Sequence, residues 1–370
     1  MWARSRPKAD GKGGEPRQAE AGLYIPVESG FSRMIIRRWG KPHMCRFTSV
    51  LVALMLTASS AFAQGGGAPV LIPNPPKDAK VVSISLEDLP YPHPVHYLEM
   101  TLYGQDVRMA YMDVPATGTA NGQTIVLMHG LNFFGEVWAP TIDVFRKEGY
   151  RVVVLDQIGF GRSSKPDIPY TLNDMARNSK AVLDQLKISK AIIMGHSMGG
   201  MTATRFALFY PETASHLIIV NQIGLEDARL QRPWGGFDAA YKASLARGWV
   251  AIRQNIERYF VKWDPKYEKY ILIHYGWTLS GDWPRLAKIR AGLQQMVYQE
   301  PVVYDWPFIK VKTLVVGGEK DGPNFPALAK RTADTIPGAQ LHLITNVGHN
   351  PHMEAPDLFY PPVVKFLKGM

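Results

Sequence analysis

The hydrophobic pattern from about residue 96 onward alternates short apolar runs with longer amphipathic stretches. Five largely apolar runs are too short for helices and show no polar alternation, which is typical of strands buried on both faces. These runs are residues 124–128, 152–155, 191–194, 217–220 and 313–316. Helical spacing predicts helices at residues 137–148, 172–186 and 198–210. This alternation predicts an α/β fold in which helices cover both faces of a mostly parallel sheet.

One interval interrupts the alternation. After residue 220 the next buried strand begins only at residue 313, and helical stretches such as 250–260 and 284–298 dominate the segment between them. Residues 226–300 hold 13 aromatic side chains, including five of the nine Trp in the chain. We interpret 226–300 as an inserted helical lid over one edge of the sheet. Most of its aromatic residues are expected to pack the insertion against the core, and a few to face a pocket.

The segment in front of the alternating region has a different composition. Residues 64–95 carry three consecutive Gly and seven Pro, which indicates a linker or a surface arm. Residues 96–103 and 106–114 then predict a leading antiparallel hairpin. We therefore place a single domain at residues 96–370.

The N-terminal part of the chain has the features of an export signal. Residues 48–63 form an uncharged apolar run, which is shorter than the roughly 20 residues that span a bilayer. Five basic residues precede the run, and it ends in Ala-Phe-Ala. This order predicts a secretory signal peptide cleaved after Ala63, and hence a periplasmic or secreted protein. An uncleaved N-terminal anchor is the alternative. Met34 or Met44 suits the start of such a signal better than Met1.

Charge and cysteine content change once the leader is set aside. The chain carries a formal charge of +10, but residues 1–63 hold 10 Lys and Arg against 4 Asp and Glu, which leaves +4 for residues 64–370. With this modest charge and no supporting motif, we expect no nucleic-acid partner. The single cysteine, Cys45, also lies in the leader, which excludes an intrachain disulfide or a multi-cysteine metal site. We expect neither a metal nor a cofactor, and no stable membrane anchor after cleavage.

A glycine-flanked serine is the strongest chemical signal. The predicted strand at 191–194 runs into Gly-His-Ser-Met-Gly-Gly, and a predicted helix follows at once. A strand, a two-glycine turn and a helix place the middle residue, Ser197, on a sharp bend at the carboxyl edge of the sheet. Ser197 is therefore the candidate nucleophile.

A serine nucleophile requires a base that accepts its proton. Of the five histidines that follow Ser197, His349 is favoured because it lies in a loop between a strand-like run and the last helical region. His352 is expected to be structural. Asp321, in the loop after the strand at 313–316, is the candidate acid that orients the base, with Glu319 and Asp227 as fallbacks.

The oxyanion of a tetrahedral intermediate needs backbone donors. The N–H of Met198, which follows the nucleophile, is one candidate, and the N–H of Leu131, in the loop after the strand at 124–128, is the other. Asn132 is a second choice. The candidate substrate-pocket residues are Asn132, Trp138, Trp234 and Trp277.

These motifs resemble those of the α/β-hydrolase superfamily over residues 96–370. The resemblance rests on five motifs in the expected order: His129-Gly130, Asp156-x-x-Gly159-Phe160-Gly161-x-Ser163, Gly195-His196-Ser197-Met198-Gly199-Gly200, Gly318-x-x-Asp321 and Gly348-His349-x-x-His352-x-Glu354-x-Pro356. It implies a central, mostly parallel eight-stranded sheet with a lid inserted after the sixth strand. The most similar branch contains haloalkane dehalogenases, epoxide hydrolases and small-ester hydrolases. The first two use Asp as nucleophile, so Ser197 favours acyl transfer to water.

The sequence therefore predicts a secreted serine hydrolase of carboxylic esters that works through an acyl-enzyme on a small-molecule substrate. Its aromatic lid favours an apolar or aromatic acyl group over a charged one. Lactone hydrolysis, C–C bond hydrolysis and perhydrolysis stay open, because they use the same triad. A ligand-binding protein without turnover is a remote alternative, and the sequence leaves the oligomeric state open.

The cleavage site can be tested directly. Protein recovered from the exported fraction should begin at Gln64, because the Ala-Phe-Ala sequence immediately before it has the small residues that signal peptidases require. N-terminal sequencing or intact mass measures this. An N-terminus close to Met1 in exported material would contradict the signal-peptide prediction.

Overall fold

The computed structural model describes residues 73–369. The expected leader and its cleavage site after Ala63 lie outside these residues, as does the first part of the expected linker at 64–95. Among residues 73–369, no helix has both the length and the hydropathy that a membrane span requires.

Eight strands form one sheet in the order β1-β2-β4-β3-β5-β6-β7-β8. The strands are β1 (Val95–Leu102), β2 (Gln105–Val114), β3 (Thr124–Met128), β4 (Arg151–Leu155), β5 (Ala191–His196), β6 (Ala214–Val220), β7 (Lys312–Gly318) and β8 (Gln340–Ile344). β1 and β2 form an antiparallel hairpin, β2 pairs antiparallel with β4, and every later pairing is parallel. The expected mostly parallel, eight-stranded sheet is confirmed.

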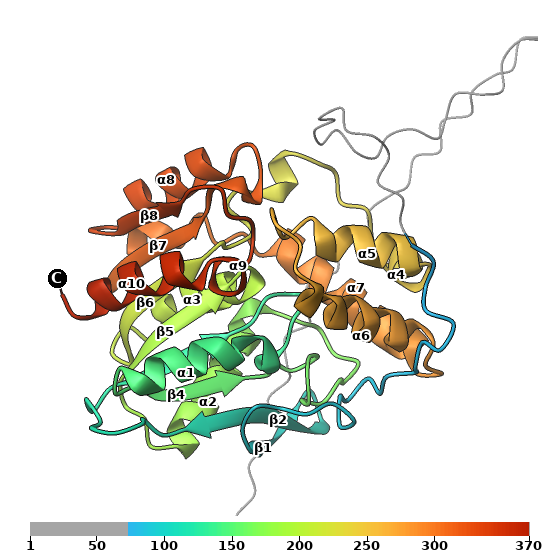
Figure 1. Ribbon diagram of the computed structural model, residues 1–370, viewed down its shortest axis with the longest axis horizontal. Helices are drawn as coiled ribbons and strands as arrows, with labels where there is room; N and C mark the ends of the chain where they lie inside the picture. Colours follow the sequence, from blue (N-terminus) through green and yellow to red (C-terminus); the bar gives the residue numbers. More distant parts are fainter. Residues whose placement is uncertain (1–72, 370) are drawn as a thin grey trace, which may run out of the picture. The chain divides into compact units, whose positions relative to one another are not determined.

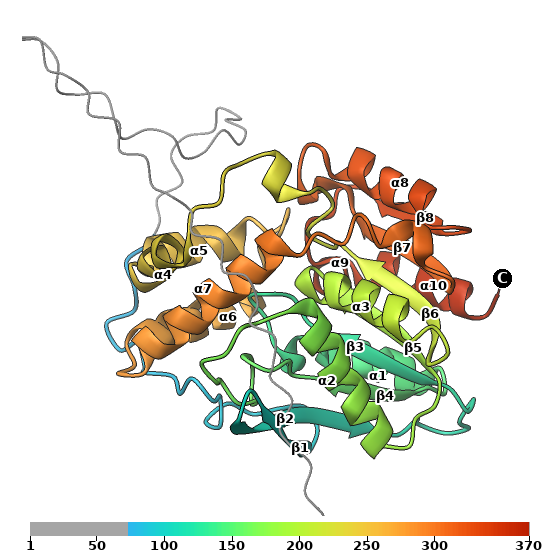
Figure 2. The same ribbon diagram turned by 180° about the vertical axis from the view of Figure 1, so that it is seen from behind.

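Ten α-helices accompany the sheet in the described residues. They are α1 (Ala139–Lys147), α2 (Leu172–Gln185), α3 (Met198–Phe209), α4 (Phe237–Leu245), α5 (Trp249–Glu257), α6 (Glu268–Thr278), α7 (Trp283–Gln299), α8 (Phe325–Thr335), α9 (Pro351–Glu354) and α10 (Pro356–Leu367). α1, α9 and α10 are seen in front of the sheet in Figure 1, and α2, α3 and α8 in front of it in the reverse view of Figure 2. The fold is thus a three-layer sandwich with helices on both faces.

The two faces of the sheet explain why its central strands lack polar alternation. Every residue of β3 is buried, and its side chains divide between two hydrophobic clusters. One cluster joins the sheet to α1 and α10, for example through Ile142 and Val363. The other joins it to α2, α3 and α8, for example through Phe206 and Ala329. Strands covered by helices on both sides need apolar residues at every position.

The structure extends several predicted elements and adds others. β6 begins three residues before the predicted apolar run, with Ala-Ser-His, because strand pairing continues beyond the buried core. The predicted helix at 137–148 begins as a short 3-10 helix, η1 (Gly135–Trp138), before α1. The pattern gave no clear signal for α6, whose buried residues lie on more than one side of the helix and so form no single apolar stripe.

The interval between β6 and β7 contains α4, α5, α6 and α7 together with short 3-10 helices such as η2 (Ala228–Leu230). Figures 1 and 2 show α4–α7 gathered at the end of the sheet away from the C-terminus. These helices occupy the range in which the sequence predicts an inserted lid at 226–300. The longest of them, α7, packs chiefly against α4.

Residues 73–94 contain no helix or strand, but they pack against the domain, which a linker would not do. Ile84 and Leu86 are buried in a cluster with Trp277 and Trp283 of the inserted helices. The indole N–H of Trp277 donates to the carbonyl oxygen of Ser83 at 3.2 Å. Of the two expectations for this segment, a surface arm describes it better than a linker.

The aspartate of the motif at 156–163 connects this arm to the loop after β3. The Asp156 carboxylate accepts hydrogen bonds from the N–H of Gly135 at 2.6 Å, the N–H of Arg162 at 2.8 Å and the hydroxyl of Tyr91 at 2.7 Å. A Cβ on Gly161 would lie only 2.1 Å from that carboxylate. The motif is therefore structural: it fixes the course of the loop that carries Leu131.

We expect the arm to contribute to the stability of the domain. Leu86→Ala should lower the free energy of unfolding by about 2–5 kcal/mol, because Leu86 is fully buried and its removal leaves a cavity. Urea unfolding measures the change. Val81→Ala, an exposed position in the same arm, is the control and should change stability by less than about 0.5 kcal/mol. Equal, small effects from both variants would show that the arm is only loosely attached.

Candidate active site

Ser197 lies on a strained turn between β5 and α3. Its φ of 56° falls in the left-handed region that residues other than Gly rarely adopt. The turn is closely packed, because a Cβ on Gly195 would lie 2.0 Å from the carbonyl oxygen of Gly199, and a Cβ on Gly199 would lie 2.2 Å from that of Met128. Only glycine fits at either position. The two-glycine turn inferred from the sequence is therefore a packing requirement.

His349, which is buried, and Asp321, which is half-buried, form a hydrogen-bonded pair. The Nδ1 atom of His349 lies 2.8 Å from Oδ1 of Asp321. Asp321 ends the short 3-10 helix η5 (Glu319–Asp321), which follows β7, and His349 follows β8. Because β5, β7 and β8 are parallel strands of one sheet, the residues after them meet at the same edge. The structure thus brings the candidate base and acid together as the sequence predicts.

Asn221 supports the carboxylate of Asp321 from the other side. Its side-chain amide donates to Oδ2 of Asp321 at 3.0 Å, and its Oδ1 accepts the N–H of Gly318 at 3.0 Å. Asn221 lies directly after β6 and also has a positive φ, of 39°. Sequence reasoning missed this residue, although its place at the carboxyl end of a buried strand was a signal that could have identified it.

The loop that carries His349 is fixed to the nucleophile strand and to the inserted segment. The carbonyl oxygen of His349 lies 2.9 Å from Nε2 of His196, the residue before Ser197. The N–H of His349 donates to the carbonyl oxygen of Tyr259 at 2.8 Å, and the two rings have centroids 4.8 Å apart. His349 is therefore positioned by contacts on its backbone and its ring, in addition to Asp321.

The two candidate oxyanion donors lie on segments that touch each other. A Cβ on Gly130 would lie 2.9 Å from the Cβ of Ser197, so the loop that continues to Leu131 runs directly against the nucleophile turn. Within residues 73–369, neither the N–H of Leu131 nor that of Met198 donates to a backbone acceptor. Both groups therefore have the unpaired N–H that stabilisation of an oxyanion requires.

The fallback residues serve other purposes. Asp227 accepts hydrogen bonds from the Arg229 guanidinium, which holds the pKa of Asp227 well below its usual range. Glu319 accepts the N–H of Asn346 at 3.1 Å. His352 is fully buried, and burial together with the charge of His349 lowers its pKa to about 3. It stays neutral, with its ring stacked on Trp138 at 4.6 Å, as expected of a structural histidine.

Two of the candidate pocket tryptophans pack the interior instead. Trp138 is fully buried in the cluster between the sheet and α1. Trp277 packs the arm against α6 and α7. Their large apolar rings suited a pocket, but the same property suits a core. Neither ring lines either of the two cavities at the inserted helices.

Trp234 and Leu131 do line one cavity. It has a volume of about 370 Å³ and lies between the loop after β3, the segment after η2 and helices α4 and α7. Trp234 is 59% exposed, and its indole N–H donates to the side chain of Gln295 across the cavity wall. This cavity begins at a candidate oxyanion residue and is walled by the inserted helices, but Ser197, Asp321 and His349 are not among its lining residues.

Asn132 is part of a hydrogen-bond network that the sequence did not predict. Its amide donates to the hydroxyl of Tyr259 at 2.6 Å and accepts from the guanidinium of Arg290 at 2.8 Å. Its backbone carbonyl oxygen lies 2.9 Å from Nε2 of His274. Tyr259 and Arg290 were missed because the contacts that single them out join segments more than 100 residues apart.

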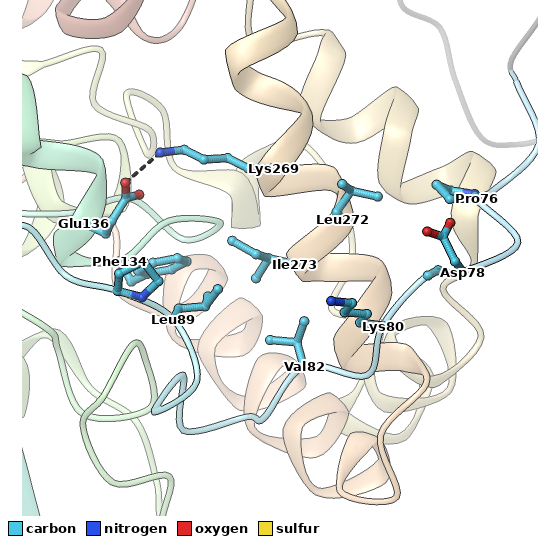
Figure 3. A pocket seen from close by; sticks show the side chains of 12 residues that line it. Pro76, Asp78, Lys80, Val82, Leu89, Phe134, Glu136, Lys269, Leu272 and Ile273 are labelled. Atoms are coloured by element: carbon cyan, nitrogen blue, oxygen red, sulfur yellow. Dashed lines mark hydrogen bonds and ion pairs between the residues drawn. The ribbon is translucent and has the colours of Figure 1, made fainter.

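A second cavity of about 480 Å³ lies between the arm and α6 (Figure 3). Val82 and Leu89 of the arm face Ile273 of α6 and Phe134 across it, and Lys269 forms an ion pair with Glu136 at its rim. None of the candidate catalytic residues lines this cavity. In the part of the chain that the structure describes, no group of three or more His, Cys, Asp and Glu side chains could hold a metal ion.

Comparison with known proteins agrees with this fold and arrangement. A family model described as "alpha/beta hydrolase fold" matches residues 123–356, so the chain belongs to the α/β-hydrolase family. A crystal structure described as a probable hydrolytic enzyme of Pseudomonas aeruginosa PAO1 is 37% identical, with a TM-score of 0.75. That alignment covers 78% of this chain and 98% of the Pseudomonas chain.

Two curated relatives are named for their substrates. A 2-hydroxy-6-oxononadienedioate/2-hydroxy-6-oxononatrienedioate hydrolase of Paraburkholderia phymatum is 38% identical over 34% of this chain, and the match spans 43% of that relative. A 2-hydroxy-6-oxo-6-(2'-aminophenyl)hexa-2,4-dienoic acid hydrolase of Metapseudomonas resinovorans is 26% identical over 73% of this chain and 91% of its own length. The protein is thus a hydrolase of the α/β family.

The close packing of the nucleophile turn predicts a strong effect of one methyl group. Gly199→Ala should destabilise the protein by several kcal/mol, because the new Cβ would overlap the backbone of β3 and neither segment can move without the other. Thermal unfolding measures the change. Gly281→Ala is the matched control, since nothing lies within 4 Å of a Cβ there. Similar melting temperatures for the two variants would contradict this description of the turn.

Proposed function

We propose that this protein is a serine hydrolase that cleaves carboxylic esters through an acyl-enzyme intermediate. The observation that carries the proposal is the hydrogen bond between His349 and Asp321, at the sheet edge where Ser197 stands on its strained turn. A serine, a histidine and a carboxylate in this order and placement form the arrangement that activates a hydroxyl group. Ser197 in place of an aspartate argues against dehalogenase and epoxide hydrolase chemistry.

The mechanism that we propose has two half-reactions. The Ser197 hydroxyl adds to the ester carbonyl while Nε2 of His349 accepts its proton, and Asp321 stabilises the resulting imidazolium through Nδ1–H. The N–H groups of Met198 and Leu131 hold the oxyanion. The intermediate collapses to the acyl-enzyme, and His349 returns the proton to the departing alcohol. Water then repeats the sequence with His349 as base, which releases the acid and restores Ser197.

Asn221 is a positioning residue in this scheme. It donates to the Asp321 oxygen that does not contact His349, so both carboxylate oxygens are held. This contact fixes the plane of the carboxylate and, through it, the tautomer of His349 that leaves Nε2 free to act as base.

A second candidate reaction on the same residues is hydrolysis of a C–C bond. It is favoured by the two relatives named as hydrolases of 2-hydroxy-6-oxo dienoic or dienedioic acids. Lactone hydrolysis and perhydrolysis would use the same acyl-enzyme. We prefer ester hydrolysis because acyl transfer to water is the simplest reaction of such a triad, and the cavity that begins at Leu131 offers room for an acyl chain.

We further propose that the reaction takes place outside the cytoplasm. The support is the basic, apolar and small-residue order of residues 33–63. We propose a small-molecule substrate and no nucleic-acid partner, in keeping with the formal charge of +4 after Ala63. No membrane anchor would remain after cleavage.

Ser197→Ala should lower the turnover of p-nitrophenyl esters by roughly 10⁴-fold or more while leaving the fold intact, because the variant lacks the hydroxyl that is proposed to attack the ester. The assay is initial rates over short, medium and aromatic acyl esters and lactones, with circular dichroism to confirm folding. Ser280→Ala, in the turn between α6 and α7, is the control and should behave as wild type.

A fluorophosphonate probe separates an enzyme from a binding protein without turnover. Wild type should form one covalent adduct on Ser197, detected by peptide mass spectrometry. Retained ester turnover in Ser197→Ala would show that the nucleophile is misassigned. Absence of an adduct in folded wild type would instead favour the ligand-binding alternative.

A further inference from the structure

Arg290 on α7 is a buried cation without a carboxylate partner. Only 7% of its surface is exposed. Its Nη2 donates to the side-chain oxygen of Asn132, a neutral amide, and its buried Nε has no acceptor among the described residues. Burying an unpaired charge is costly unless another charge compensates it. The charge of Arg290 is therefore left without an anion.

Arg253 on α5 shows the usual solution in the same inserted segment. It is as buried as Arg290, and both of its Nη atoms contact the carboxylate of Glu268 at 2.9–3.1 Å. In addition, Oε1 of Glu257 lies 3.4 Å from Nη1 of Arg253. The buried guanidinium of Arg253 is thus neutralised by carboxylates, whereas that of Arg290 has no carboxylate partner among the described residues.

The surroundings of Arg290 add positive charge and supply no negative charge. Burial and the nearby charge of Arg247 lower the pKa of Arg290 to about 9, so it stays protonated at neutral pH. Arg247 forms no ion pair within residues 73–369, and burial lowers its pKa as well. Both arginines, together with burial, lower the pKa of His274, which is therefore neutral. The site holds two cations and needs an anion.

This cluster is directly connected to the candidate catalytic residues. Arg290 contacts Asn132, which follows the candidate oxyanion residue Leu131. Asn132 in turn donates to the hydroxyl of Tyr259, whose ring lies against that of His349 with centroids 4.8 Å apart. Arg290 is thus linked through Asn132 and Tyr259 to the histidine of the proposed triad, and this link is what relates an anion at Arg290 to the substrate.

We propose that Arg290 and Arg247 form a subsite for a carboxylate carried by the substrate, a short chain away from the bond that is cleaved. The inference rests on the proposed function and narrows it to monoesters of dicarboxylic acids or comparable acyl groups with a free carboxylate. Guanidinium groups suit this task because they bind carboxylates through two N–H groups in one plane. This proposal differs from the sequence-based expectation of an apolar or aromatic acyl group, and comparison of charged with neutral esters distinguishes the two.

Selectivity between matched substrates is the test. The substrates are mono-p-nitrophenyl esters of dicarboxylic acids from succinate to adipate, each paired with its neutral methyl ester. Wild type should prefer the charged member of at least one pair in kcat/KM. Arg290→Met should lower that preference by about 10- to 100-fold, because hydrogen bonds to charged groups have this magnitude. Arg285→Met is the matched control, since Arg285 is an exposed arginine on the same helix, and it should keep the wild-type preference.

Two further variants cover the case in which Arg290→Met does not fold. Arg247→Met changes a half-buried side chain and should lower the preference by about 3- to 10-fold. Arg290→Lys keeps the charge but loses the planar fork, and its preference should fall between those of wild type and Arg247→Met. Equal preference for charged and neutral esters in folded wild type would overturn the proposal. An unchanged preference in folded Arg290→Met and Arg247→Met would overturn it too.

Binding to a protein that cannot turn over separates this inference from the proposed function. Calorimetry on Ser197→Ala should show monomethyl adipate binding at least about 10-fold more tightly than dimethyl adipate, and Arg290→Met in that background should remove the difference. If this result holds while wild type hydrolyses no ester, the subsite stands and the reaction is misassigned. If wild type hydrolyses neutral esters and carboxylates bind no better, the hydrolase stands and the subsite is wrong.

Discussion

The contact between the nucleophile turn and its neighbouring strand is the constraint on which the site depends. The backbone around Gly199 lies so close to β3 that no side chain fits between them. Gly195 lies equally close to the backbone of Gly199. This contact holds Ser197 at a φ that a free chain would avoid. The loop after β3 also runs directly against this turn, since a Cβ on Gly130 would lie 2.9 Å from the Cβ of Ser197.

The parallel sheet then supplies the remaining groups. Because neighbouring strands end at the same edge, the residues after β6, β7 and β8 meet although long stretches of sequence separate them. Asn221, Asp321 and His349 form a chain of hydrogen bonds along that edge. The inserted helices add Tyr259 against His349 and Arg290 against Asn132. The proposed catalytic residues thus come from the sheet edge, and the proposed carboxylate subsite comes from the insertion.

Residues that belong to short local motifs were predictable from the sequence. Ser197, Asp321 and His349 each lie within a few residues of a predicted strand and close to glycines, so pattern and spacing identify them. Asn221, Tyr259 and Arg290 were not predictable, because what distinguishes them is a contact with a distant segment. The tryptophans show the opposite error. Trp138 and Trp277 are large aromatic residues of the kind that line pockets, but both are buried in hydrophobic clusters. The sequence alone does not reveal which face of a helix is covered by other elements.

The arm at residues 73–94 is attached to the inserted helices, so the two segments depend on each other. Its backbone carbonyl groups accept the indole N–H of Trp249 from Pro73 and of Trp277 from Ser83, so each contact closes a loop of well over 150 residues. These contacts can form only after the inserted helices have been synthesised, although the arm emerges from the ribosome long before them. A chain that begins at β1 would keep every strand and the His349–Asp321 pair, yet lose two acceptors that hold the insertion. The N-terminal boundary chosen for expression would thus act on the fit of the substrate before it acts on the chemistry.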